Sequence, residues 1–281
     1  MNSCLPLREN SESPRLLAAP ASKRRRDPIP MTIGIGMICK DGIVLASDSQ
    51  ASYGGSSTHK RTDTQKLVKI AFGETKALIS MAGGIDFFDA LCGKIEERVP
   101  ATEVTSQRSI ADCIQGAVKD LKTELFNQAI GPQQTGDRWD ELFRDYGCEL
   151  MIAYYYQAIP CFYKVDFSMG LVIPVRTPFH VIGCAFELAD FIMSGVRIKE
   201  LSTSEALAVG AYVVEMAKTH DQKCGGRTWL GATYQMGTAK ILAEEEAEEY
   251  EGLAKDFEKR NRTQWIDTIG NMLPDGFRFL Y

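Results

Sequence analysis

The stretch TIGIGMICKDGIVLASDSQAS, residues 32–52, decides the predicted fold. It contains two apolar, β-branched runs, Thr32–Cys39 and Ile43–Ser47, which are joined by Lys40-Asp41-Gly42. An Asp-Gly pair between two such runs is a strong signal for a β-hairpin. Both runs are almost continuously apolar, which is typical of strands that are covered on both faces. We therefore predict an antiparallel hairpin within a buried sheet.

Downstream of the hairpin, groups of predicted strands alternate with pairs of predicted helices. The strands are expected at 66–72, 76–81, 149–156, 160–165, 171–174, 180–182 and 229–236. The helices are expected at 86–98, 109–126, 186–194 and 202–219, with a loop at 131–136 and an acidic C-terminal helix beginning near Thr238. The helix at 202–219 opens with Ser202-x-x-Glu205, a capping box. A doubly wound sheet would alternate single strands with single helices. The grouping instead favours an α+β domain with two packed antiparallel sheets and a helix pair on each outer face.

Composition excludes several classes of function. The chain has 281 residues and a net charge of −5, so no basic excess indicates nucleic-acid binding. Its longest strongly apolar stretch, 206–214, is far shorter than the roughly 18–20 residues that cross a bilayer. The eight cysteines include no C-x-x-C pair and follow no zinc-ligand spacing. We therefore expect a cytoplasmic protein with reduced thiols, without nucleic-acid or membrane partners.

Residues 1–30 differ from the remainder of the sequence. They contain five of the eleven prolines, no aromatic residue and the basic run Lys23-Arg24-Arg25-Arg26. Such a segment buries too little apolar area to offset its ordering entropy. We predict that 1–31 is a disordered leader or upstream extension, and that 32–281 is a single domain. The basic run is interpreted as solvated charge.

Only three histidines are available, which limits histidine-based catalysis. His220-Asp221 is a weak candidate for a metal pair, since no further histidine accompanies it. Removal of residues 1–31 would make Thr32 the N-terminal residue. Its α-amine, with an ordinary pKa of about 8, would then serve as general base for its own hydroxyl.

The surrounding motifs carry a family resemblance. The segments 32–52, 63–70 (DTQKLVKI), 80–84 (SMAGG) and 220–226 (HDQKCGG) occur in the order and spacing of a mature proteasome β subunit. The chain also resembles the bacterial HslV-type relatives, which begin Met-Thr as Met31-Thr32 does here. The resemblance covers most of residues 32–240. It implies the four-layer αββα sandwich of N-terminal-nucleophile hydrolases and a threonine-type endopeptidase activity.

The resemblance also assigns catalytic roles. It implies Thr32 as nucleophile, Lys66 beside its hydroxyl, Asp48 as the partner of Lys66, the Gly83 N–H as oxyanion donor and Asp221 as a hydrogen-bond partner. Each role fits ordinary chemistry, because a cation favours the alkoxide and a buried ammonium needs a counter-charge. Family members usually carry serine at the positions of Cys184 and Cys224. We expect the catalytic site to persist with altered hydrogen bonding at these two positions, because a thiol forms weaker hydrogen bonds than a hydroxyl.

Substrate and partners follow from the same resemblance. An extended peptide or unfolded protein would lie beside Ala51, Ser52 and Gly83, with Met81 and Ile85 as candidates for an apolar specificity pocket. The resemblance implies no metal and no organic cofactor. It implies a homo-oligomeric ring, which an ATPase often feeds. Two alternatives remain: an N-terminal-nucleophile amidase for a small amide, and a catalytically silent ring subunit.

Overall fold

The structure, a computed structural model, describes residues 32–53, 59–129, 148–167 and 170–272. The predicted leader and the predicted loop at 131–136 lie outside these ranges. Among the helices within them, none combines the length and apolar character needed to cross a membrane.

The predicted hairpin lies inside a five-stranded antiparallel sheet. Strand β1 is Ile33–Ile38 and β2 is Gly42–Asp48, and Ile38 lies opposite Ile43 next to the turn. The sheet order is β10-β1-β2-β11-β12. The other strands are β10 (Phe179–Gly183), β11 (Thr228–Tyr234) and β12 (Ala239–Ile241). The hairpin prediction is therefore confirmed.

A second antiparallel sheet has its strands in chain order. These are β5 (Leu67–Phe72), β6 (Thr75–Gly83), β7 (Cys148–Tyr156), β8 (Ile159–Asp166) and β9 (Leu171–Pro174). A separate two-stranded antiparallel sheet pairs β3 (Ala51–Tyr53) with β4 (His59–Arg61) in the polar segment between β2 and β5. Three-residue strands carry too little alternation to be recognised from sequence.

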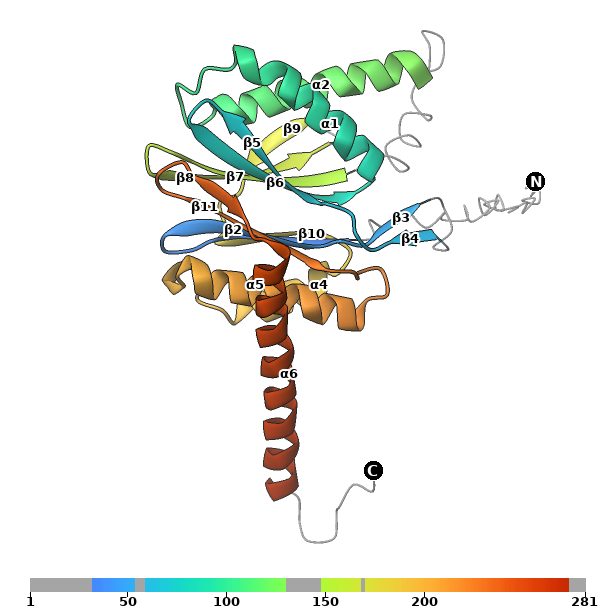
Figure 1. The fold of residues 1–281 in the computed structure, drawn as a ribbon, viewed down its shortest axis with the longest axis vertical. Helices are drawn as coiled ribbons and strands as arrows, with labels where there is room; N and C mark the ends of the chain where they lie inside the picture. The colour runs from blue at the N-terminus through green and yellow to red at the C-terminus, as the bar shows by residue number, and fades with distance from the viewer. Residues whose placement is uncertain (1–31, 54–58, 130–147, 168–169, 273–281) are drawn as a thin grey trace, which may run out of the picture.

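Two helix pairs enclose the sheets. The first pair is α1 (Ile85–Arg98) and α2 (Ser109–Ala129), and the second is α4 (Phe186–Ser194) and α5 (Thr203–His220). Short 3₁₀ helices follow at Val99–Ala101 (η1) and Ile198–Glu200 (η2). Figure 1 shows the first pair against the β5–β9 sheet and the second against the sheet containing β1 and β2. The predicted α+β class with two antiparallel sheets is confirmed.

Three apolar clusters hold these elements together, and they explain the unbroken hydrophobic runs. In β1, Ile35 and Met37 join the cluster shared with α4 and α5. In β2, Leu45 joins the cluster between the two sheets, whereas Val44 faces the helices. Adjacent strand residues point to opposite faces. Both faces of these strands are therefore buried, which requires apolar residues at successive positions.

The predicted capping box at the start of α5 is present. The Ser202 hydroxyl accepts a hydrogen bond from the Glu205 N–H, and the Glu205 carboxylate accepts one of 2.8 Å from the Ser202 N–H. Two backbone donors of the first turn are thereby satisfied. The helix ends at His220 with Asp221 as its C-cap.

The start of the C-terminal helix is corrected. Helix α6 spans Glu244–Met272, whereas the sequence prediction placed its start near Thr238. Residues Ala239–Ile241 instead pair with β11 as the edge strand β12. Gly237, with a φ of 72°, makes the tight turn that returns the chain to the sheet. The pairing stabilises an extended conformation that local periodicity does not reveal.

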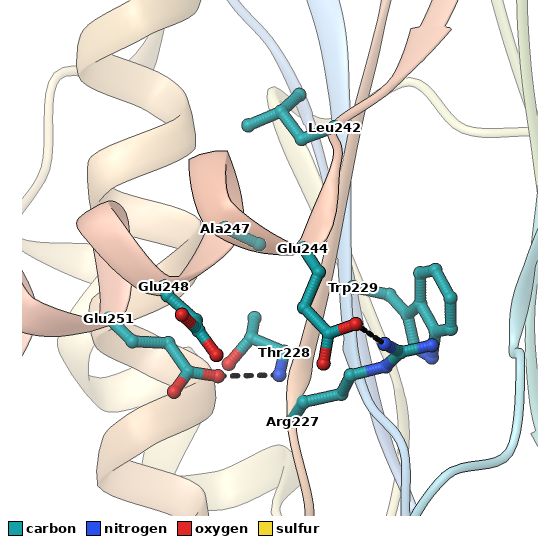
Figure 2. Close-up of a pocket in the computed structure, with 8 residues that line it drawn as sticks. All are labelled: Arg227, Thr228, Trp229, Leu242, Glu244, Ala247, Glu248 and Glu251. Carbon is teal, nitrogen blue, oxygen red and sulfur yellow. Dashed lines mark hydrogen bonds and ion pairs between the residues drawn. The ribbon is translucent and has the colours of Figure 1, made fainter.

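Helix α6 docks on the body of the protein through a shared carboxylate. Glu251 Oε1 accepts hydrogen bonds of 2.6 Å from the Thr228 N–H and 2.9 Å from Lys218 Nζ. Figure 2 shows Glu251 pointing from the helix to Thr228, beside the ion pair of Arg227 with Glu244. Glu251 is 14% exposed and Lys218 10%, so both charges are largely removed from water.

We expect Glu251→Ala to lower the free energy of unfolding by about 2 kcal/mol, because it leaves the Thr228 N–H without its acceptor and removes the closer of two carboxylates that pair with Lys218, the other being Glu215 at 3.5 Å. Burial raises the pKa of Glu251, but its hydrogen bonds with Thr228 and Lys218 outweigh burial and hold that pKa below its ordinary value. The contribution is therefore present above about pH 4.3 and lost as pH falls further. Urea titrations at several pH values measure both effects. Glu248→Ala is the matched control because Glu248 is exposed on the same helix, and equal destabilisation by both variants would contradict the prediction.

Candidate active site

Thr32 immediately precedes β1 and is enclosed by neighbouring segments. Only 1% of the residue is exposed. Its carbonyl accepts a 2.8 Å hydrogen bond from the Cys184 N–H, and its Oγ1 donates to the Gln50 carbonyl over 3.3 Å. The pairing of β1 with β10 places Ile33 opposite Gly183. The sheet register therefore determines where the Thr32 side chain lies.

Lys66 immediately precedes β5, and its ammonium contacts the Thr32 hydroxyl. Nζ donates to Thr32 Oγ1 and to the Gln50 carbonyl, and it pairs with Asp48 Oδ1 at 2.9 Å. These three contacts match the three donors of an ammonium group. Lys66 is 1% exposed and Asp48 0%. The cation is thus held against the hydroxyl and shielded from water.

Asp48, the last residue of β2, links three parts of the site. Besides pairing with Lys66, its carboxylate accepts hydrogen bonds of 3.2 Å from the Ile33 N–H and 3.0 Å from the Gly225 N–H. A buried carboxylate needs such partners to offset its desolvation. Asp48 therefore fixes the start of β1 and the loop after α5 relative to Lys66.

Burial sets the electrostatics of this pair. Desolvation lowers the pKa of Lys66, and the charge and hydrogen bond of Asp48 oppose this change. Desolvation likewise raises the pKa of Asp48, opposed by Lys66 and by the backbone donors. A lysine with a lowered pKa gives up its proton more readily near neutral pH. The arrangement is suited to exchanging a proton with the adjacent hydroxyl or to stabilising an alkoxide.

Cys184, Asp221 and Cys224 form a second group of side chains beside the Thr32 backbone. Cys184 follows β10, and Cys224 lies in the loop that follows Asp221. The two sulfurs are 3.4 Å apart, and the hydrogen bond between them lowers the pKa of Cys184 and raises that of Cys224. The Thr32 backbone also lowers the pKa of Cys184, whereas the nearby Asp221 carboxylate raises it. Within the described ranges, this is the one group of three potential metal ligands whose ligand atoms lie within 4.8 Å of one another.

Two glycines shape the backbone around Thr32. Gly183 has a φ of 92°, and a Cβ at this position would overlap the Thr32 carbonyl oxygen and lie 3.2 Å from the Cβ of Ala82. Gly83, at the end of β6, has a φ of 127°. Both φ values lie where residues with a side chain are strained. Gly183 therefore allows the end of β10 to approach the Thr32 backbone closely.

The predicted substrate-binding residues lie in different environments. Ala51 is buried in β3, and Ser52 follows it in the same strand. Met81 is fully buried in the core between β6 and the first helix pair, against which Ile85 at the start of α1 also packs. Met81 is thus enclosed by the core in this structure. Because Ala82 is near Gly183, the end of β6 does lie beside Thr32.

The structure brings together most of the predicted catalytic residues. Lys66 contacts both Thr32 and Asp48, Cys184 adjoins the Thr32 backbone, and Asp221 and Cys224 lie beside Cys184. Sequence reasoning missed Gln50, whose carbonyl accepts from Lys66 and Thr32. A backbone carbonyl acts independently of residue type, so it leaves no sequence signal. Sequence reasoning also missed the role of Gly183. The available signal was its position, directly after the strand predicted at 180–182 and before Cys184.

Comparison with known proteins identifies the family. Residues 32–228 match the family model for the proteasome subunit. The sequence is 24% identical over 214 residues to proteasome subunit beta 1 of Thermococcus onnurineus (strain NA1), covering 76% of this chain and 94% of that protein. The chain therefore belongs to the proteasome subunit family, and the resemblance noted from the sequence is confirmed.

Solved structures of Anbu proteins share the fold. Anbu (ancestral beta-subunit) from Yersinia bercovieri has a TM-score of 0.66 and 15% identity, covering 89% of this chain and 100% of that chain. The helical assembly of the Anbu complex from Pseudomonas aeruginosa gives a TM-score of 0.59 at 15% identity, covering 88% and 100%. Identities this low establish similarity of fold alone.

Proposed function

We propose that the protein is a threonine-type endopeptidase with Thr32 as its N-terminal nucleophile. One observation carries the proposal: the buried Lys66 ammonium contacts the Thr32 hydroxyl while it pairs with Asp48. A hydroxyl needs an activating group to act as a nucleophile near neutral pH. The buried Lys66 ammonium does not need the Thr32 hydroxyl to stabilise its charge, because Asp48 already supplies the counter-charge.

The proposed reaction begins when Thr32 Oγ attacks the peptide carbonyl. Its own α-amine takes the hydroxyl proton and passes it to the leaving amine, and the Lys66 cation stabilises the developing alkoxide. The Gly83 N–H donates to the oxyanion, aided by the N-terminus of the following helix α1. Water then hydrolyses the acyl-enzyme. Cys184, which adjoins the Thr32 backbone, would orient the amine together with its neighbours Asp221 and Cys224.

The amine of Thr32 must be free for this chemistry. We propose that residues 1–31 are a leader or upstream extension absent from the mature protein, and that 32–281 is its single domain. The family match, which begins at Thr32, supports this division. Removal of a methionine before a small residue such as threonine would complete the exposure.

Substrate, architecture and partners complete the proposal. We place the two sheets and their helix pairs in the four-layer class of N-terminal-nucleophile hydrolases. An unfolded peptide would lie extended beside Ala51, Ser52 and Gly83. Of the two candidates for lining an apolar specificity pocket, the half-buried Ile85 is retained, whereas Met81 is enclosed in the core. Membership of the proteasome subunit family supports a homo-oligomeric ring in the cytoplasm, with an ATPase as a candidate partner.

The test combines intact mass with covalent labelling. We expect the purified protein to begin at Thr32, and we expect a peptide carrying a hydroxyl-reactive electrophile to modify that residue, as located by tandem mass spectrometry. Thr32→Ala should abolish both labelling and peptide hydrolysis, because it removes the nucleophile and keeps the backbone.

Each other outcome favours a different function. Mature protein that begins at Thr32 but is not labelled supports a silent ring subunit. Labelling accompanied by hydrolysis of small amides alone supports an amidase. Protein that still begins at Met1 and hydrolyses peptides would contradict the role of the Thr32 amine.

A further inference from the structure

We propose that Cys184, Asp221 and Cys224 form a binding site for Zn²⁺ beside the nucleophile. The observation is the convergence of two sulfurs and a carboxylate, whose ligand atoms lie within 4.8 Å of one another. Thiolates with a carboxylate or a nitrogen are the donors that Zn²⁺ prefers, in tetrahedral geometry. Sequence spacing gave no such indication, because Cys184 and Asp221 come from separate segments that only folding brings together.

The distances suit a metal ion better than a disulfide. Zn–S bonds of about 2.3 Å in a tetrahedron place two sulfurs about 3.8 Å apart. The observed separation is 3.4 Å, so a few tenths of an ångström of movement is sufficient. A disulfide requires an S–S distance of about 2.05 Å, so the sulfurs would have to close by more than an ångström.

The surroundings also support binding. Cys184 and Asp221 are only half-buried, which leaves an entry path, whereas Cys224 is buried. The Lys223 N–H donates to Asp221 Oδ1 over 2.9 Å and orients the carboxylate. Such outer contacts hold metal ligands in position. The three protein ligands leave a fourth tetrahedral position.

The Thr32 nitrogen is the candidate for the fourth ligand. The Thr32 carbonyl accepts a 2.8 Å hydrogen bond from the Cys184 N–H, and the Thr32 backbone influences the Cys184 thiol, so the two residues are adjacent. In a chain beginning at Thr32 this nitrogen would be an α-amine with a lone pair, and it would complete an S₂ON donor set. Zn²⁺ bound there would occupy the general base, so it would inhibit hydrolysis reversibly. This consequence rests on the proposed function, whereas metal binding itself does not.

Cobalt titration tests the site independently of activity. Chelator-treated protein is titrated with Co²⁺ while thiolate-to-cobalt charge-transfer absorption is recorded, and Zn²⁺ is then added to displace the cobalt. We expect one ion per chain in the wild type and in Thr32→Ala, which cannot hydrolyse peptides but keeps the nitrogen. Replacing both sulfur ligands, in Cys184→Ser/Cys224→Ser, should weaken binding by at least about 100-fold.

Controls separate this site from other thiols and from misfolding. Cys92→Ser should leave the titration unchanged, because Cys92 is a half-buried thiol on α1 outside the cluster. Asp221→Asn keeps both sulfurs and should weaken binding by about 10-fold or more. Absence of the charge-transfer band in the wild type, or its persistence at full strength in the double variant, would overturn the proposal. Zn²⁺ binding by a chain that begins at Thr32 but hydrolyses no peptide after chelator treatment would support the metal site and count against the proposed function alone.

Discussion

Lys66→Met is expected to reduce peptide hydrolysis by about 1,000-fold, because it removes the cation that contacts the Thr32 hydroxyl. The same change leaves the fully buried Asp48 without its counter-charge. We therefore also expect the free energy of unfolding to fall by about 3 kcal/mol. Steady-state hydrolysis of a fluorogenic peptide, by chains that begin at Thr32 according to intact mass, measures the first effect. Denaturant unfolding measures the second.

A double variant separates catalysis from folding. In Asp48→Asn/Lys66→Met, both charges are replaced by neutral side chains of similar size, which removes the unpaired carboxylate. We expect this variant to recover most of the lost stability and to remain inactive. Full recovery of hydrolysis together with stability would mean that Lys66 serves folding alone, and the proposed role in activating Thr32 would be wrong.

Gly183→Ala is expected to damage both stability and activity. The new methyl group would overlap the Thr32 carbonyl oxygen, and alanine is strained at a φ of 92°. The backbone must shift to accommodate it, so we expect a loss of about 3 kcal/mol or more in the free energy of unfolding. Displacement of the nucleophile should lower hydrolysis by at least about 100-fold. Urea titration and peptide hydrolysis measure the two effects.

Gly73→Ala is the matched control for this variant. Gly73, in the turn between β5 and β6, also has a positive φ of 60°, but a Cβ there would have no atom within 4 Å. Gly73→Ala therefore measures the effect of backbone strain alone. We expect it to lower the free energy of unfolding by about 1 kcal/mol and to leave peptide hydrolysis unchanged. If Gly183→Ala behaves like Gly73→Ala, the close approach to Thr32 has no functional consequence.

The elements of the core were predictable because their signals are local. The Asp41-Gly42 turn and the two flanking apolar runs predicted β1 and β2, and their burial on both faces follows from that pattern. The Ser202 capping box likewise predicted the start of α5. Turn geometry and capping depend on a few adjacent residues, so they are visible before the chain folds.

Elements that depend on distant partners were missed. Residues 239–241 form the strand β12 because β11 supplies hydrogen-bond partners, and the sequence alone indicated a helix there. The short strand β3 similarly depends on its pairing with β4. At such positions the free energy of strand pairing outweighs the weak conformational preference of the local sequence.

The candidate site divides in the same way. The sequence by itself determined which residue types are available: Thr32, the aspartate that ends β2, the lysine immediately before β5, and the cysteines at positions 184 and 224. Only the tertiary structure decided that the Lys66 ammonium contacts Thr32 Oγ1 and that Cys184 meets Cys224, which lies 40 residues further along the chain. The reason is physical: side-chain contacts depend on strand register, on close approach at glycines such as Gly183, and on burial, which arise when distant segments pack together.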